Sequence, residues 1–282
     1  MPNEKLAELD AGRFSEETVD ELLRRSRRSV NNVLRSIRRP EAALGVVKSP
    51  LGDLLVAVGG HGLLLVHYLP ADKELTALIV RLRSCFDPVE DRQTVHEVGA
   101  EVTKYLAGAA QALRQRVDLS LVTTSFQKRV LHKLQEVPRG AVVSYQALGF
   151  LAGAPKGARA IGNAMHNNPV PIYVPCHRVI AADGRIGGYG GGRERKLQLL
   201  RSEGFALGKA DEKLPDGVVW GHKGTRIFCR NDCRTTARVD RTKIMFFADP
   251  GEAEHAGLRP CKICRPDRKS EASPDYSLPG DP

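Results

Sequence analysis

Two short segments decide the fold and the chemistry of this chain: PCHRV at residues 175–179 and GGYGGG at residues 187–192. A cysteine directly before a histidine suits a reactive thiol, because the thiolate is the nucleophile and a neighbouring imidazole lowers the pKa of the thiol. A lone cysteine is otherwise most often a small buried hydrophobic residue. The residues around Cys176 and His177 therefore decide between a nucleophile and a core residue.

The surrounding blocks resemble the catalytic domain of the O6-alkylguanine-DNA alkyltransferases. The likeness runs from about Thr124 to Gly204, with the blocks in the order and spacing of that family. It is carried by VSYQ at 143–146, ARAIG at 158–162, NPVPI at 168–172, VPCHRV at 174–179, GGY at 187–189, Lys196, Leu199-Leu200 and Glu203-Gly204. A looser likeness to the strands of the family's N-terminal domain covers Gly45 to Leu69.

Composition and charge agree with a DNA-binding protein. The 282 residues are enough for about two domains, and the net charge of +10 favours a polyanionic partner. There is no run of 18 apolar residues and no signal-peptide pattern, so no membrane association is expected. The cysteine usage fits a reducing compartment. We expect a monomer in the cytoplasm at the nucleoid, or in the nucleus if the source is eukaryotic.

The pattern of apolar residues predicts an α+β protein built from several parts. Helices are expected at 75–85, 97–106, 125–137, 145–152, 156–167 and 193–202, with two strands around the GGHG turn at 59–62. The expected parts are a basic helical extension (1–40), a small α/β domain (41–122), the alkyltransferase domain (123–205), a linker (206–217), a zinc module (218–268) and a disordered tail (269–282). The basic helix that begins near Ser15 is either a solvated face or an auxiliary DNA contact.

Residues 145–167 have the layout of a helix-turn-helix, with GAP at 153–155 as the turn. The resemblance implies that the second helix enters the minor groove and that Arg159 fills the space of an extruded nucleotide. We expect Tyr145 and Arg178 to contact DNA as well.

The resemblance also implies a displacement in which the Cys176 sulfur attacks the alkyl carbon and guanine leaves. Tyr145 would give a hydrogen bond to the base, and His177, acting through a water and held by Glu203, would take the thiol proton. Asn168 would brace the site. The thioether product is stable, so the protein would react once, without an organic cofactor.

The glycine-rich loop is implied to cover the base. Tyr189 and Gly190 are expected to bind it, and Gly190 stands where the family often has a small hydroxyl residue, which implies one hydrogen bond fewer. Lys196 is expected at the same substrate site, where it orders the loop or polarises the site; its alternative is an ordinary surface lysine.

Four further cysteines have the spacing of a closed zinc site: Cys229 and Cys233, then Cys261 and Cys264. The segment resembles the zinc module of the adaptive-response alkyltransferases, in which the first cysteine takes a methyl group from a DNA phosphotriester. Cys229 holds that place. The module is C-terminal here, and Asn231-Asp232 departs from the family pattern, so a module that only binds zinc stays open.

Two other functions compete with repair of double-stranded DNA that contains O6-alkylguanine. A sensor of alkylated bases would lack the cysteine, which is present here. A thiol hydrolase would use the Cys-His pair but would leave Arg159 and the helix-turn-helix without a role.

Overall fold

The computed structural model describes residues 20–21, 24–28, 39–69, 73–155, 157–208, 211–215, 218–230, 233 and 243–267. The chain divides into two compact units, Met1–Pro40 and Glu41–Pro282. In the first unit, residues 20–21 and 24–28 are helical, in agreement with the basic helix predicted from Ser15. The remainder of that helix and the expected tail at 269–282 lie outside the described residues. Within the described ranges, no helix is both long and apolar enough to cross a membrane.

The second unit begins with a four-stranded sheet in the order β3-β2-β1-β4. Its strands are β1 (Glu41–Val47), β2 (Leu54–Gly59), β3 (Gly62–Tyr68) and β4 (Asp87–Glu90). The predicted hairpin around the glycine turn is confirmed: β2 and β3 are antiparallel, with Gly59 opposite Gly62. Strand β4, which runs parallel to β1, was not predicted because it is short and contains Pro88.

Two helices belong to this sheet, α2 (Lys73–Cys85) and α3 (Arg92–Leu106). Asp91 caps α3 by accepting a hydrogen bond from the Thr94 backbone, so this helix begins earlier than the pattern indicated. A Cβ atom at Gly99 would lie 2.8 Å from the Val47 Cβ, so the glycine lets α3 approach β1 closely. This packing brings Tyr105, near the end of α3, into the protein interior.

The helix-turn-helix is present as predicted. Helix α4 (Ser125–Gln135) and strand β5 (Ala141–Ser144) precede its two helices, α5 (Tyr145–Leu151) and α6 (Ala158–His166). Ser144 caps α5 through the Ala147 backbone N–H, and Gly153, with φ of 75°, makes the turn. A short 3₁₀ helix η1 (Cys176–Arg178), strand β6 (Val179–Ile180) and helix α7 (Arg193–Ser202) follow.

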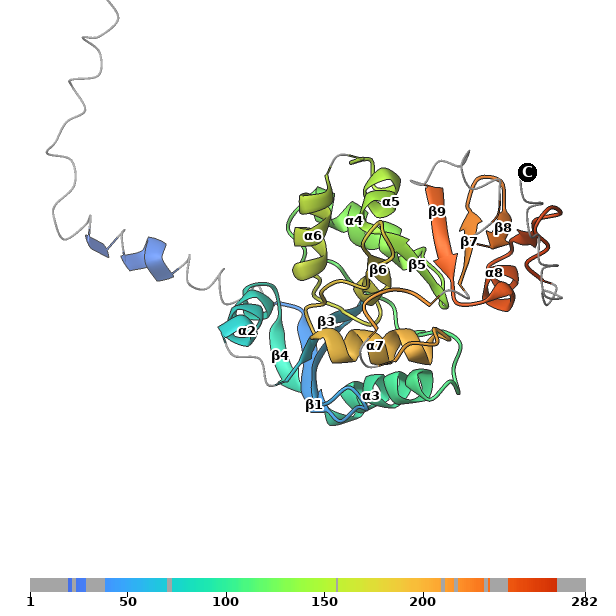
Figure 1. The fold of residues 1–282 in the computed structure, drawn as a ribbon. Coiled ribbons are helices and arrows are strands. Elements are labelled where there is room, and N and C mark those ends of the chain that lie inside the picture. Colours follow the sequence, from blue (N-terminus) through green and yellow to red (C-terminus); the bar gives the residue numbers. More distant parts are fainter. Residues whose placement is uncertain are drawn as a thin grey trace, which may run out of the picture. The chain divides into compact units, whose positions relative to one another are not determined.

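The C-terminal segment continues the sheet of the catalytic part. It contains β7 (Val219–His222), β8 (Ile227–Arg230), β9 (Ile244–Phe247), α8 (Pro250–His255) and β10 (Arg259–Pro260). The six strands lie in the order β10-β8-β7-β9-β5-β6 (Figure 1). Antiparallel pairing of β9 with β5 sets Phe247 opposite Ala141 and Phe246 opposite Val142. The zinc module expected at 218–268 therefore shares one sheet with strands of the alkyltransferase domain expected at 123–205.

The segment expected to be a linker is also packed. Phe205 and Leu207 are buried at the start of this segment, and Val218 is buried directly after its end. The Ile186 N–H donates to the Glu212 carbonyl, and the Leu214 N–H donates to the Gly184 carbonyl. The prediction of a linker at 206–217 is wrong for its described residues, because widely spaced apolar residues anchor a stretch whose average composition is polar and charged.

Candidate active site and metal centre

Cys176 opens the 3₁₀ helix η1, and its side chain is only 9% exposed. The Asn168 Nδ2 lies 3.2 Å from the Cys176 Sγ and also donates to the Val174 carbonyl at 2.9 Å. The Asn168 Oδ1 accepts from the Val170 N–H at 3.1 Å. One side chain thus contacts both the thiol and the loop that leads to it.

The surroundings of the Cys176 thiol have opposing effects on its pKa. Burial raises its pKa, whereas the hydrogen bond from Asn168 and the positive charge of Lys196 lower it. The effect of burial is the largest, so the pKa stays above its ordinary value. The thiol is protonated at rest and needs a base in order to react.

His177 and Glu203 form a fully buried pair. The His177 Nε2 and the Glu203 Oε1 are 2.8 Å apart, and neither side chain is exposed to solvent. Burial lowers the pKa of His177 although the carboxylate opposes this, so the imidazole is neutral at pH 7. A neutral ring that donates from Nε2 keeps its lone pair on Nδ1, and Nδ1 has no hydrogen-bond partner among the described protein groups. His177 is therefore ready to accept a proton.

Arg178 is not placed for DNA binding, and this correction follows from its burial. Its side chain is 9% exposed. Its Nε donates to Glu203 Oε2 at 2.9 Å, its Nη2 to Glu203 Oε1 at 2.8 Å and its Nη1 to the Val137 carbonyl at 2.6 Å. Burial raises the pKa of Glu203, but Arg178 and His177 outweigh that effect and keep the pKa well below its ordinary value. Arg178 thus keeps the carboxylate ionised.

A pocket of about 380 Å³ opens beside Cys176, within the range of small-molecule sites. The predicted residues Tyr145, Tyr189 and Gly190 line it. Further lining comes from Gly162, Met165 and His166 of helix α6, and from Gly188. The helix-turn-helix, the thiol and the glycine-rich loop therefore meet at one pocket.

Lys196 is fully buried behind the loop rather than exposed in the pocket. Its Nζ donates to three carbonyls, those of Val179, Ile186 and Gly188. Burial lowers its pKa to about 8. In this position Lys196 can order the loop and act electrostatically on Cys176. Because it is buried, it is not an ordinary surface lysine. It is also not among the residues that line the pocket.

Arg159 is exposed in the first turn of α6, the helix that also supplies Gly162, Met165 and His166 to the lining of the pocket. An exposed arginine at the start of this helix is free to reach outside the protein, as the prediction requires.

Two residues near the site escaped the sequence analysis. Tyr68 of β3 shares a hydrogen bond with the pocket residue Tyr189, and Tyr105 of α3 donates one to Glu203. They lie 121 and 98 positions from their partners in the chain. No local pattern links such distant positions; the only available signal was the loose likeness of the N-terminal strands.

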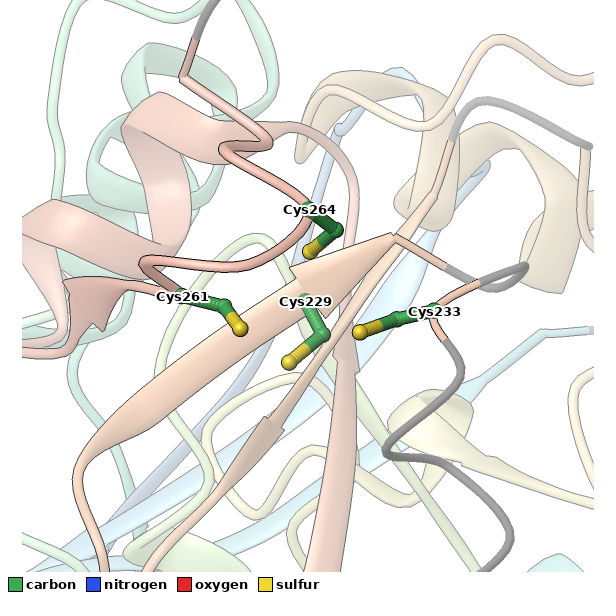
Figure 2. A group of neighbouring side chains, drawn as sticks. All are labelled: Cys229, Cys233, Cys261 and Cys264. Carbon is green, nitrogen blue, oxygen red and sulfur yellow. The ribbon is translucent and has the colours of Figure 1, made fainter.

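The four cysteines Cys229, Cys233, Cys261 and Cys264 converge on one point (Figure 2). Their sulfur atoms all lie within 4.8 Å of one another, and all four side chains are buried. Backbone N–H groups of Arg230 and Ile263 point at the sulfurs of Cys264 and Cys261 at 3.4 Å. Tetrahedral zinc with bonds of about 2.3 Å to sulfur requires sulfur atoms roughly this close. The donor set therefore fits a metal ion.

Comparison with known proteins agrees with both sites. Residues 125–205 match the family described as 6-O-methylguanine DNA methyltransferase, DNA binding domain, and residues 205–267 match the metal binding domain of Ada. The human methylated-DNA–protein-cysteine methyltransferase is 55% identical over 86 residues, which cover 30% of this chain and 42% of that protein. The Mycobacterium leprae protein of that name is 37% identical over 155 residues, which cover 55% of this chain and 88% of that protein. A Mycobacterium tuberculosis OGT crystallised with DNA is 34% identical, covers 58% of this chain and 92% of that chain, and has a TM-score of 0.47.

The fold and the site thus define a DNA-binding domain of the 6-O-methylguanine DNA methyltransferase type joined to a metal-binding domain. The chain belongs to the methylated-DNA–protein-cysteine methyltransferase family, since it covers 88% of the M. leprae member. The matched region spans less than half the length of the human relative.

Proposed function

We propose that this protein repairs double-stranded DNA by moving the alkyl group of O6-alkylguanine onto its own Cys176. One observation carries the proposal: the Cys176 thiol lies at a pocket beside the helix-turn-helix, held by Asn168 and next to the His177–Glu203 pair. The family name of the relatives states the same class of reaction.

The reaction is a direct displacement. The proton of Cys176 passes through a water to His177 Nδ1, and the imidazolium formed is stabilised by Glu203. The sulfur then attacks the alkyl carbon, the carbon–oxygen bond breaks, and guanine leaves with the electron pair on O6. Burial raises the pKa of Tyr145, so the phenol keeps its proton and can donate a hydrogen bond to the departing base.

The damaged base must leave the duplex to reach the thiol. Helix α6 enters the minor groove, where sequence readout is poor and a repair protein can act at any site. Arg159, exposed at the start of α6, fills the space of the extruded nucleotide. The base occupies the pocket, with Tyr189 and Gly190 of the loop as part of its lining.

The protein acts once per molecule. The product is a thioether, and a carbon–sulfur bond of this kind does not hydrolyse as an acyl thioester does. A hydrolase would need a group that discharges the enzyme.

Cys229, Cys233, Cys261 and Cys264 would hold one zinc ion, which would keep the four sulfurs as thiolates and add to the stability of the fold. Cys229 is the most buried of the four, at 2% exposed. This burial favours a metal ligand over a second acceptor for phosphotriester methyl groups.

Intact mass after reaction with duplex DNA that carries O6-methylguanine tests the proposal. We expect one added methyl group, located on Cys176 by peptide mapping and absent in Cys176→Ala, which should still bind DNA. Binding without any methyl transfer would instead identify a sensor of alkylated bases. DNA with methylphosphotriesters should add no second methyl group; a methyl on Cys229 would show that this cysteine is also an acceptor.

A further inference from the structure

We propose that Tyr105 is a positioning residue for alkyl transfer: its hydroxyl shares the Glu203 carboxylate with His177 and so limits how strongly Glu203 supports the histidine. The inference rests on the proposed function, because it concerns the base that deprotonates Cys176. Tyr105 belongs to the N-terminal α/β part, outside the matched DNA-binding domain at 125–205.

The contacts of Tyr105 are short and enclosed. The residue is 2% exposed, and its hydroxyl donates to Glu203 Oε1 at 2.7 Å. The same hydroxyl accepts from the Arg178 Nη2 at 2.9 Å. Since Arg178 Nη2 also donates to Glu203 Oε1, the three groups close a triangle. One phenol thus satisfies both an arginine and a carboxylate that face each other in the interior.

The carboxylate oxygen at one corner of this triangle accepts hydrogen bonds from three donors. Glu203 Oε1 accepts from Tyr105, from Arg178 and from the His177 Nε2. All three donors bind the same negatively charged oxygen, and each one weakens it as an acceptor for the others. If the phenol is removed, the oxygen becomes a stronger acceptor for His177. A stronger acceptor stabilises the imidazolium and raises the pKa of His177, so solvent protonates the histidine, and removes it as the base for Cys176, at a higher pH.

Other charged groups near the pair keep their places when the Tyr105 hydroxyl alone is removed. Arg178 stays bound to Glu203 Oε2 and to the Val137 carbonyl. The Arg139 guanidinium lies 5.9 Å from the centre of the Tyr105 ring, a contact that phenylalanine retains. Lys196 and the Cys176 thiol lie in the same buried region and are held by their own contacts. The Tyr189 ring centre lies 6.4 Å from that of His177.

Tyr173 provides a matched control. It lines the same cavity of about 230 Å³ as Tyr105, and it too is buried. Its hydroxyl donates to a different carboxylate, Glu101 Oε2, at 2.7 Å. Tyr173→Phe therefore removes a buried hydroxyl with the same kind of partner but leaves Glu203 untouched.

The test is the single-turnover rate of methyl transfer from an O6-methylguanine duplex, measured against pH for the wild type, Tyr105→Phe and Tyr173→Phe. In Tyr105→Phe we expect the midpoint of the acidic limb to move to higher pH by about half a unit, a fraction of the effect of one charge-assisted hydrogen bond. In Tyr173→Phe the midpoint should stay where the wild type has it. A Tyr105→Phe protein with a changed rate but an unmoved midpoint, or with a midpoint at lower pH, would overturn the proposal. An equal shift in Tyr173→Phe would overturn it as well.

A second measurement separates this inference from the proposed function. The rate at which iodoacetamide alkylates Cys176, followed by mass spectrometry against pH, reports the thiolate without DNA. A wild type that reacts with iodoacetamide but takes no methyl from DNA would contradict the proposed repair activity alone. An unshifted iodoacetamide midpoint in Tyr105→Phe, with normal folding by circular dichroism, would contradict the role of Tyr105 alone.

Discussion

The hydroxyl oxygens of Tyr68 and Tyr189 lie 2.7 Å apart, and this contact joins the N-terminal sheet to the loop that lines the pocket. Their rings meet edge to face with centres 6.1 Å apart, and the Arg195 guanidinium lies 4.8 Å from the centre of the Tyr68 ring. A Cβ atom at Gly191 would clash with that ring, so the glycine is needed for the close approach. The N-terminal sheet therefore supports one wall of the pocket.

Tyr68→Phe should slow methyl transfer from duplex DNA by up to about tenfold, because one buried hydrogen bond contributes roughly 1 kcal/mol to the ordered loop. The number of methyl groups accepted should stay at one per protein. Single-turnover kinetics followed by intact mass measure both quantities. An unchanged rate would show that ring packing alone holds Tyr189.

Asn168→Ala should shift the acidic limb of the pH–rate profile to higher pH. Burial already raises the pKa of the Cys176 thiol, and the Asn168 hydrogen bond is the largest effect that lowers it. Removing that bond raises the thiol pKa further, so less thiolate forms at a given pH.

The neighbouring Asn167 gives the control for this experiment. It is exposed, and its amide donates to the Asn163 carbonyl rather than to the thiol. Asn167→Ala should leave the midpoint unchanged. A midpoint that moves to lower pH in Asn168→Ala would contradict the role of its hydrogen bond.

Arg159→Ala should slow repair of duplex DNA at least tenfold and leave the reaction with free O6-benzylguanine nearly unchanged, because only the duplex needs a group that replaces the extruded nucleotide. Arg185→Ala, a change at another exposed arginine, should affect neither reaction. Rates that fall equally on duplex and free base in Arg159→Ala would instead indicate damage to the pocket.

Cys261→Ser should release the zinc and also destabilise the catalytic part by several kcal/mol, since structural zinc supplies about 10 kcal/mol in isolated modules and β9 pairs with β5. Metal analysis, thermal unfolding and the methyl-transfer rate measure the three consequences. The exposed Cys85 offers a matched control, and Cys85→Ser should keep the metal and the stability. Full stability and activity without the metal would show that the two parts are independent.

The predictable features were those with a local cause. Helices such as α6 and α7 follow from apolar spacing and turn residues, and the four cysteines follow from their paired spacing. The pairing of β9 with β5 joins segments about a hundred residues apart through only two register pairs, so no short sequence pattern predicts it. Arg178 was expected to contact DNA, and arginines are mostly exposed, whereas this one is buried. Its burial depends on Glu203 and Tyr105, which meet it only in the folded chain.

Because the sheet is continuous, strand β9 of the C-terminal segment covers an edge of strand β5 in the catalytic part. Strand β9 occupies the side of β5 that faces away from β6. A chain cut after Phe205 would keep Cys176, His177 and Glu203, but it would expose the backbone N–H and C=O groups of Ala141 and Val142 along a bare strand edge. Such an edge pairs readily with strands of other molecules. Proteolytic loss of the segment would therefore leave a strand edge open to such pairing on a chain that still carries its reactive cysteine.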